Sequence, residues 1–415
     1  MQEKTKEPEI RFAGFTGAWE QRKVKDLAAN TYGGGTPSTS NPEFWEGSIP
    51  WIQSSDLSEH NLFRVHPRKF ISHAAVANSS VKIIPENSIA VSTRVGVGKL
   101  AVMSFPYTTS QDFLSLSNLN TDVKFTSYQL YRRLQKDLNA VQGTSIKGIT
   151  KEELLGKNIY IPGCQEQEAI GKFFSKIDSL LTLHQRKYEK LLNIKKSMLE
   201  KMFPKEGEVV PEIRFKGFTG AWEQRELGEI SEIKTGPFGS SLHASDYVAD
   251  GVPIITTEHF KFGSIEKNKY LIPMVSDTDH SRLIAYSLKT GDIVFSRVGS
   301  VDINALVEPE SDGWLFSGRV LRVRSSEKYD SGFLHNLLET DDVRNDIRNR
   351  AVGQTMPSIN TQILSATELT IPSSKREQQR IGNFFKGINQ LLTLHQRKLE
   401  MLKNVKQAFL EKMFV

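Results

Sequence analysis

The sequence of 415 residues contains a single cysteine, Cys164, and no long apolar run. One cysteine excludes an internal disulfide, and no Cys and His cluster has the spacing of a zinc site. No window reaches the roughly 20 continuous apolar residues that a membrane span requires, and the opening MQEKTKEPEI lacks the apolar core of a secretion signal. We therefore expect a cytoplasmic chain of two or three domains with no membrane partner.

Motifs of cofactor chemistry are also missing. Gly96, Gly98 and Lys99 resemble a phosphate-binding loop, but Thr93 stands where its first Gly is required, and Leu100 where Ser or Thr is required. No Gly-rich turn of the dinucleotide or S-adenosylmethionine type occurs elsewhere. The sequence therefore predicts a protein that is not an enzyme by itself and that holds no cofactor or metal.

Basic residues outnumber acidic ones, 54 to 48. The excess is uneven, because residues 1–164 carry +4, residues 211–375 carry −5, and residues 165–203 and 376–415 carry +3 and +5. A basic balance favours a polyanionic partner, since Lys and Arg that neutralise phosphates release condensed counterions. Because one large block is acidic, any nucleic-acid surface on it must be a local patch.

The chain is internally duplicated. Residues 8–22, PEIRFAGFTGAWEQR, recur at 211–225 with 14 of 15 positions identical, and residues 165–203 match 376–414 at 24 of 39 positions. Between these anchors the halves diverge, with fainter similarity of IPWIQSSDL to VPIITTEHF and of QGTSIKGIT to VGQTMPSIN. A repeated frame with divergent contents suits two copies of one partner and two different targets.

Each divergent block predicts a mixed α/β domain. Short Val, Ile and Phe runs at 81–84, 89–91 and 292–295 predict strands, and the best helical stretches are 126–139 and 331–350. The expected fold class is therefore α/β (α+β), with two globular mixed domains and a pseudo-two-fold internal repeat. The predicted parts are a first globular domain (1–164), a helix (165–203), a linker (204–210), a second globular domain (211–375) and a second helix (376–415).

The two repeated helices are predicted to be amphipathic. In the first copy the heptad positions are Ile170, Phe173, Ile177, Leu180, Leu191, Ile194 and Met198, with a flanking column of Phe174, Leu181, Tyr188 and Met202. The second copy follows the same register, with Leu391 at the place of Leu180. Two rods of about 58 Å would bury this stripe against each other as an antiparallel coiled coil. An alternative, in which each domain is capped by its own helix, stays open.

Polar and basic residues on turns suit contact with DNA, because hydroxyl groups donate to phosphates, Gln pairs with adenine and Arg with guanine. In the first block the candidates are Thr36, Ser38, Gln53, Ser54, Ser55, Arg94, Lys99, Thr144, Ser145 and Lys147. In the second block they are Ser240, Ser241, Thr256, Thr257, Arg297, Arg319, Arg322, Arg324, Gln354 and Thr355. The glycines at 33–35 would let the backbone approach phosphates closely. Arg319, Arg322 and Arg324 would lie on one face of a strand.

The duplicated frame, the divergent blocks and the paired helices resemble the specificity (S) subunit of a type I restriction-modification system. The helix-start patterns IPGCQEQEAIGKFFSKID and IPSSKREQQRIGNFFKGIN are similar to that family, as is the repeated GFTGAWEQR. The resemblance implies two target recognition domains that each read one half of a bipartite double-stranded DNA site, joined by a helical spacer. It also implies that two methylation (M) subunits dock on the repeated regions, and that restriction (R) subunits join the full complex. S-adenosylmethionine, ATP and Mg are then expected only on those partners.

Two other classes of protein stay open. A fused DNA methyltransferase would need to bind S-adenosylmethionine itself. A coiled-coil scaffold would share the helices but would not bind DNA.

Overall fold

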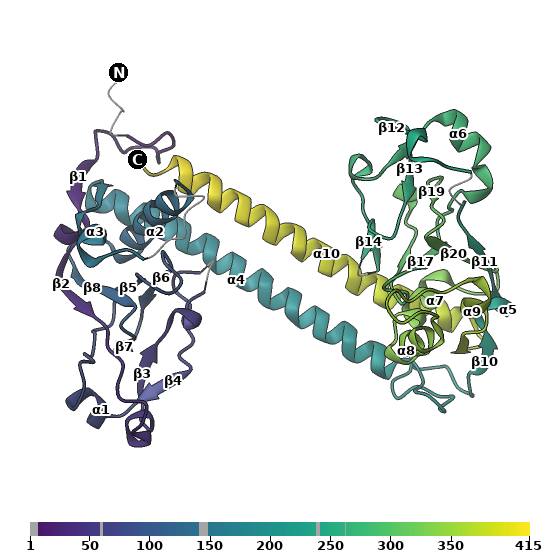
Figure 1. Cartoon of the computed structure of the whole chain (residues 1–415), viewed down its shortest axis with the longest axis horizontal. Coiled ribbons are helices and arrows are strands. Elements are labelled where there is room, and N and C mark those ends of the chain that lie inside the picture. Colours follow the sequence, from purple (N-terminus) through teal and green to yellow (C-terminus); the bar gives the residue numbers. More distant parts are fainter. Residues whose placement is uncertain (1–6, 59–60, 141–147, 238–240, 262) are drawn as a thin grey trace. The chain divides into compact units, whose positions relative to one another are not determined.

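The protein forms two compact units in a computed structural model (Figure 1). The structure describes residues 7–58, 61–140, 148–237, 241–261 and 263–415. Unit 1 comprises residues 1–186 and 396–415, and unit 2 comprises residues 187–395. Each unit therefore holds one divergent block together with a part of each repeated helix.

Unit 1 is built on a four-stranded antiparallel sheet in the order β2-β8-β5-β6. Its strands are β2 (Ala28–Gly33), β5 (Ser88–Ser92), β6 (Leu100–Met103) and β8 (Phe113–Leu119). A second sheet, in the order β4-β3-β7, consists of β3 (Ile49–Ile52), β4 (Lys69–Ile71) and β7 (Thr108–Thr109). The antiparallel pair consists of β1 (Glu20–Lys23) and β9 (Asn158–Ile161). The α-helices of this block are the short α1 (His73–Ala77), the longer α2 (Val123–Ala140) and the short α3 (Lys151–Gly156).

Unit 2 repeats this plan, with a four-stranded antiparallel sheet in the order β11-β20-β17-β18. Its strands are β11 (Ser231–Thr235), β17 (Ile293–Ser296), β18 (Asn304–Leu306) and β20 (Val320–Ser325). The second sheet, β12-β16-β13-β19, consists of β12 (Tyr247–Val248), β13 (Val252–Ile255), β16 (Met274–Val275) and β19 (Leu315–Phe316). The two-stranded pairs are β10 (Glu223–Glu226) with β21 (Glu368–Ile371), and β14 (Phe260–Lys261) with β15 (Ser264–Ile265). The helices are α5 (Leu227–Ile230), α6 (Asp277–Arg282), α7 (Ser331–Leu338), α8 (Asp341–Arg350) and α9 (Thr361–Ser365).

The second sheets share one topology, which confirms the expected mixed α/β class and internal repeat. Strand β3 pairs antiparallel with β4 and parallel with β7, just as β13 pairs antiparallel with β16 and parallel with β19. The runs at 89–91 and 292–295 fall on β5 and β17, while 331–350 divides into α7 and α8. Residues 81–84 are not a strand and make one bridge, from Ile84 to Tyr107, because Pro85 has no N–H with which to extend a ladder.

The repeated segments form two long helices, α4 (Cys164–Lys201) and α10 (Lys375–Lys412). Within unit 1 the beginning of α4 packs against the end of α10, since the rings of Phe173 and Phe409 are 5.1 Å apart. Within unit 2 the end of α4 shares a hydrophobic core with the beginning of α10. The expected antiparallel contact between the helices is therefore present inside each unit.

The repeated start of each long helix is explained by how it docks on its domain. Gln167 Oε1 accepts a hydrogen bond from the Asp122 backbone N–H (2.9 Å), and Gln167 Nε2 donates to the Pro162 carbonyl (2.8 Å). A Cβ at Gly171 would lie 3.0 Å from the Phe125 backbone nitrogen, so the close approach requires glycine. The equivalent residues in unit 2, with matching contacts, are Gln378, Asp330, Pro372, Gly382 and Phe333.

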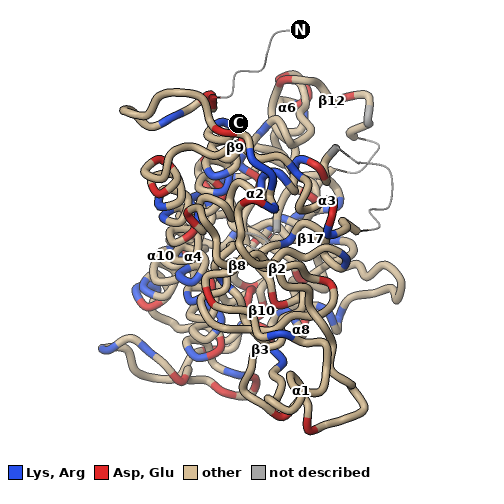
Figure 2. The backbone as a smooth tube through the Cα atoms, turned by 90° about the vertical axis from the view of Figure 1, so that its left-hand side faces the viewer, with Lys and Arg blue, Asp and Glu red and all other residues tan. Residues whose placement is uncertain are grey.

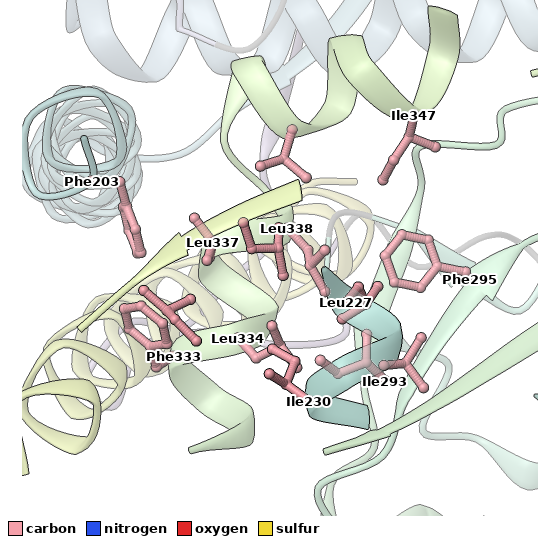
Figure 3. Close-up of a cluster of buried hydrophobic side chains, with 14 of the residues drawn as sticks. Phe203, Leu227, Ile230, Ile293, Phe295, Phe333, Leu334, Leu337, Leu338 and Ile347 are labelled. Carbon is pink, nitrogen blue, oxygen red and sulfur yellow. The ribbon is translucent and has the colours of Figure 1, made fainter. Parts of the chain in front are cut away.

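A phenylalanine that follows each long helix is held in an aromatic cluster. In unit 2 the Phe203 ring lies 5.5 Å from Phe333, 5.9 Å from Phe385 and 6.2 Å from Trp222. Figure 3 shows Phe203 directed towards Phe333, beside the leucines of α7. In unit 1 Phe414 packs in the same way against three rings, those of Phe174 (5.5 Å), Phe125 (5.6 Å) and Trp19 (6.3 Å).

The buried stripe of the helices differs from the predicted heptad. Leu180 and Leu391 are 37% and 46% exposed, whereas Phe174 and Phe385 in the flanking column are fully buried. Phe174 stacks near Tyr128 of α2, with ring centroids 5.0 Å apart, and Phe385 belongs to the core that contains α7. The predicted seam is wrong at these leucines because each helix packs on its globular domain as well as on the other helix.

A lysine of each long helix pairs with a buried carboxylate. In unit 1 Lys406 Nζ lies 2.6 Å from Asp178 Oδ1, and the Tyr128 hydroxyl donates to Asp178 Oδ2 (2.5 Å). Burial, together with the Asp178 charge, raises the pKa of Tyr128 far above its ordinary value, so Tyr128 remains a neutral donor. In unit 2 Lys195 occupies the equivalent place but pairs with Glu339, which follows α7 (2.7 Å).

Basic and acidic residues are interspersed along α4 and α10 (Figure 2). In the part of the chain that the structure describes, no helix has the length and apolarity needed to cross a membrane. Among the same residues, His, Cys, Asp and Glu side chains nowhere gather in groups of three that could hold a metal ion.

Candidate nucleic-acid interface

Three predicted segments of unit 1 converge at one edge of its sheets. The Ser110 N–H donates to the Ile52 carbonyl (3.0 Å), and the Gly35 N–H donates to the Thr109 carbonyl (2.9 Å), which joins the end of β3 to the loop at 33–38. Within that loop Thr36 and Ser38 are exposed. Gly34 is required by packing, because a Cβ there would lie 1.8 Å from the Ser110 carbonyl oxygen, while the approach of this loop to phosphates stays a prediction.

The turn after β3 lies beside the turn between β5 and β6. A Cβ at Gly96 would be 3.4 Å from Ser54 Cβ, so the Gln53–Ser55 turn and the Arg94–Lys99 turn are neighbours. Gly96 has a φ of 69°, a left-handed conformation that glycine adopts without strain. Ser55 and Arg94 are exposed, while Gln53, Ser54 and Lys99 are half-buried. The arrangement brings an amide, two hydroxyl groups and a guanidinium to one surface, the donor types that suit base edges and phosphates.

Four candidates, Thr144, Ser145, Lys147 and Ser240, lie outside the described residues. The segment that follows Lys147 lies beside the turn after β5, because the Ile149 N–H donates to the Thr93 carbonyl (2.8 Å). The equivalent bond in unit 2 joins the Ile359 N–H to the Arg297 carbonyl (2.9 Å). The faint sequence similarity around residues 142–150 and 352–360 therefore corresponds to one shared backbone contact.

Unit 2 brings several of its predicted residues to the matching edge. The Ser317 N–H donates to the Ile255 carbonyl (2.9 Å), as Ser110 does to Ile52, which places Thr256 and Thr257 beside the end of β19. The Arg297 N–H donates to the Arg319 carbonyl (2.9 Å), and its guanidinium donates to the Gly318 carbonyl (3.0 Å). The exposed candidates of unit 2 are Arg319, Gln354 and Thr355, and the half-buried ones are Ser241, Thr256, Thr257 and Arg297. The Ser241 carbonyl accepts a hydrogen bond from Arg282.

The expected row of three arginines on one strand face is wrong. Arg319 precedes β20, and only Arg322 and Arg324 share a face of the strand. Arg322 is buried and pairs with Glu232 (2.6 Å), while Arg324 makes two hydrogen bonds of 2.7 Å to Asp292. These carboxylates already occupy both guanidinium groups, so the two arginines stabilise unit 2 and Arg319 alone presents an exposed cation at the loop edge.

A repeated ion pair was not predicted. Arg11 makes two hydrogen bonds of 2.7 Å to Glu166 at the start of α4, through Nε and Nη2. Nη2 also donates to the Thr16 carbonyl, and Nη1 donates to the Gly17 carbonyl. Arg214 makes the same set with Glu377, Thr219 and Gly220. The signal was present in the sequence, because both partners fall in the repeated segments. This bidentate contact fixes the repeated GFTGAW turn on the helix start.

Two copies of one domain plan, each with its own polar loop edge, define a binding protein with two different sites. The family described as the type I restriction modification DNA specificity domain matches residues 17–193 and 220–404. The chain therefore belongs to the family of type I restriction-modification specificity subunits, whose role is DNA recognition, and it is not itself the catalytic component.

Similar proteins include one curated relative and one solved structure that match nearly the whole chain. It is 24% identical over 412 residues to the type I restriction enzyme MjaIX specificity subunit of Methanocaldococcus jannaschii, a match that covers 95% of this chain and 92% of that protein. It is 33% identical over 177 residues to the EcoR124I/EcoR124II specificity subunit of Escherichia coli, covering 38% and 43% of the two chains. The fold is similar to the crystal structure of a type I S subunit from M. genitalium, with a TM-score of 0.63, 16% identity and 99% of both chains covered.

Proposed function

We propose that each unit reads one half of a bipartite DNA site through its loop edge. The observation that supports this most is the equivalent position of the two edges, which differ in the side chains they present. Unit 1 offers Gln53, Ser55 and Arg94, while unit 2 offers Arg319 and Gln354. Different donor sets on one backbone frame suit two different half-sites, because side chains at base edges determine sequence and backbone contacts determine register.

We further propose that the long helices set the length of the unread gap and bind two methylation subunits, with restriction subunits in the full complex. S-adenosylmethionine, ATP and Mg would then be held by those partners. A target on cellular DNA supports a cytoplasmic place of action. Matched exposed leucines on the two helices favour one docking site per unit, Leu180 and Leu183 in unit 1 and Leu391 and Leu394 in unit 2.

Substituting one glutamine in each unit tests the assignment of half-sites. We expect Gln53→Ala to lower the discrimination between bases at one position of the first half-site by about 1–3 kcal/mol. Gln354→Ala should have the same effect on the second half-site, because each substitution removes a proposed bidentate contact with a base. Long-read detection of modified bases in cells with each variant of the assembled complex gives the measurement. Each variant is the control for the other, and a change that spreads over both halves would contradict the assignment.

Substituting the matched leucines tests the docking sites. Leu183→Glu and Leu394→Glu should each lower the number of bound methylation subunits from two to one, because a charge in an apolar contact is costly. Mass photometry of the mixed subunits measures the stoichiometry. Leu192→Glu is the matched control, since Leu192 is also exposed but Lys403 stands at its repeat position. Retention of two methylation subunits by both variants would exclude these sites.

A further inference from the structure

Each unit carries an exposed aromatic side chain next to a lysine, on the second sheet in unit 1 and in the turn before β16 in unit 2. In unit 1 these are Lys69 and Phe70 on β4, with Phe70 39% exposed. In unit 2 they are Lys269 and Tyr270, just before β16, with Tyr270 68% exposed. Strands β4 and β16 take the same place in their sheets, because each pairs antiparallel with the strand that leads into the candidate turn. The two pairs are not at matching register, because Phe70 lies opposite Pro50 in β3, whereas Met274, four residues after Tyr270, lies opposite Pro253 in β13.

The unit 1 pair is connected to the candidate interface. Lys69 Nζ lies 5.6 Å from the ring centroids of both Trp45 and Trp51. The Trp45 indole N–H donates to the Ser38 carbonyl (3.1 Å), and the Trp51 indole N–H donates to the Gly35 carbonyl (2.9 Å). The two tryptophans therefore join the loop at 33–38 to the strand that presents Lys69 and Phe70.

A hollow of about 670 Å³ lies at this place, lined by Trp45, Arg68, Lys69 and Phe70 among others. The Arg68 guanidinium is 71% exposed, lies 3.6 Å from Asp56, and donates to the Ser55 carbonyl in the candidate turn (3.4 Å). Two cations and two aromatic rings around one open hollow suit a nucleotide, since cations bind phosphate and ring faces pack on bases and sugars.

In unit 2 the pair lies in the turn Lys269–Leu271 that leads into β16, beside Asp250. Lys269 Nζ lies 5.0 Å from the Tyr270 ring centroid and 3.1 Å from Asp250. This ion pair is exposed, so it contributes little to stability and can exchange for a phosphate. The Ile254 N–H donates to the Pro273 carbonyl (2.8 Å), which ties the segment after Tyr270 to the strand that leads into Thr256.

We propose that Lys69–Phe70 and Lys269–Tyr270 are DNA-contacting pairs that grip the sugar–phosphate backbone beside each half-site. The lysine neutralises one phosphate, and the aromatic ring packs against the adjoining nucleotide. The inference rests on the proposed function, because it requires that both units bind DNA. It adds residues that are neither in the loops assigned to base readout nor among the residues expected from the sequence.

The test uses the full chain assembled with its methylation subunits and a duplex that contains the methylated motif. Phe70→Ala and Tyr270→Ala should each weaken binding about tenfold, with an unchanged slope of log affinity against log salt. Lys69→Gln and Lys269→Gln should each reduce that slope by about one, because one phosphate contact is lost. Phe70→Trp and Tyr270→Phe should bind nearly as tightly as the natural chain. The matched controls are the exposed apolar residues Ile83 and Ile284, changed to Ala.

The outcomes separate the two proposals. If the natural complex does not bind the duplex that contains the methylated motif, the proposed function itself is overturned. A natural complex that binds, with both alanine variants and both glutamine variants unchanged in affinity and salt slope, overturns only the Lys–aromatic pairs. Variants that lose methylation subunits while the remaining complex binds DNA normally would make these pairs a protein contact and would also overturn the inference. Circular dichroism of each variant identifies any loss of fold, in which case the conservative variants and the salt slopes decide.

Discussion

Phe203→Ala should destabilise unit 2, and Phe414→Ala should destabilise unit 1, each by about 3–5 kcal/mol. Both rings are almost fully buried, at 3% and 2% exposure, and each packs against three other aromatic rings. Truncation would leave a cavity that the surrounding rings can only partly fill. Native-state hydrogen exchange, analysed separately for peptides of the two units, measures the loss of stability in each unit.

The two phenylalanines provide controls for each other. Phe203→Ala should leave exchange in the globular part of unit 1 close to that of the natural chain, and Phe414→Ala should do the same for unit 2. If both variants lowered the hydrogen-exchange protection of both units equally, or of neither unit, the phenylalanines at the helix ends would not stabilise their own units specifically. Leu394→Ala serves as a surface control, because Leu394 is 59% exposed and its truncation should change stability by less than about 0.5 kcal/mol.

Lys406→Met should destabilise unit 1 by about 3–5 kcal/mol. The substitution keeps most of the apolar stem but removes the ammonium group, and Asp178 would then be a buried carboxylate that has lost its contact with the Lys406 charge. Urea unfolding of the isolated chain, with hydrogen exchange to locate the change, gives the measurement.

A double variant separates the charge from the packing. Combining Lys406→Met with Asp178→Asn removes both charges and keeps an acceptor for Tyr128, so it should regain most of the lost stability. The chain itself offers the precedent, since Asn389 stands at the repeat position of Asp178. If the double variant were as unstable as Lys406→Met, the loss would come from packing and the ion pair would have no such role.

The duplicated frame made the fold class predictable from the sequence. Repeats of 14 in 15 and 24 in 39 identical positions required two equivalent domains and two equivalent helices, and the shared strand topology follows. The turns after β3 and β5 were also predictable as polar loops, because polar residues follow short buried runs there. Their contact with DNA stays a prediction. The local sequence pattern was sufficient to predict a strand, helix or turn wherever its formation depends mainly on its own residues.

The rest depended on long-range contacts that no local pattern contains. Arg322 and Arg324 alternate like a cationic face, yet Glu232 and Asp292, distant in sequence, pair with them. Leu180 has heptad spacing, but the domain contacts of α4 turn the buried stripe towards Phe174. Lys69 and Phe70 gave no strong signal alone, because their meaning depends on tryptophans and loops brought together by folding.

The central claim is that two different readers are separated by a distance that the long helices set. Inserting four residues after Arg186 in α4 and four after His395 in α10 lengthens both helices by about 6 Å at the boundary between the units. Methylome sequencing of cells with this variant should show both half-sites unchanged and the unread gap longer by one or two base pairs, at about 3.4 Å each. An unchanged gap, or a motif without two separate halves, would contradict the account.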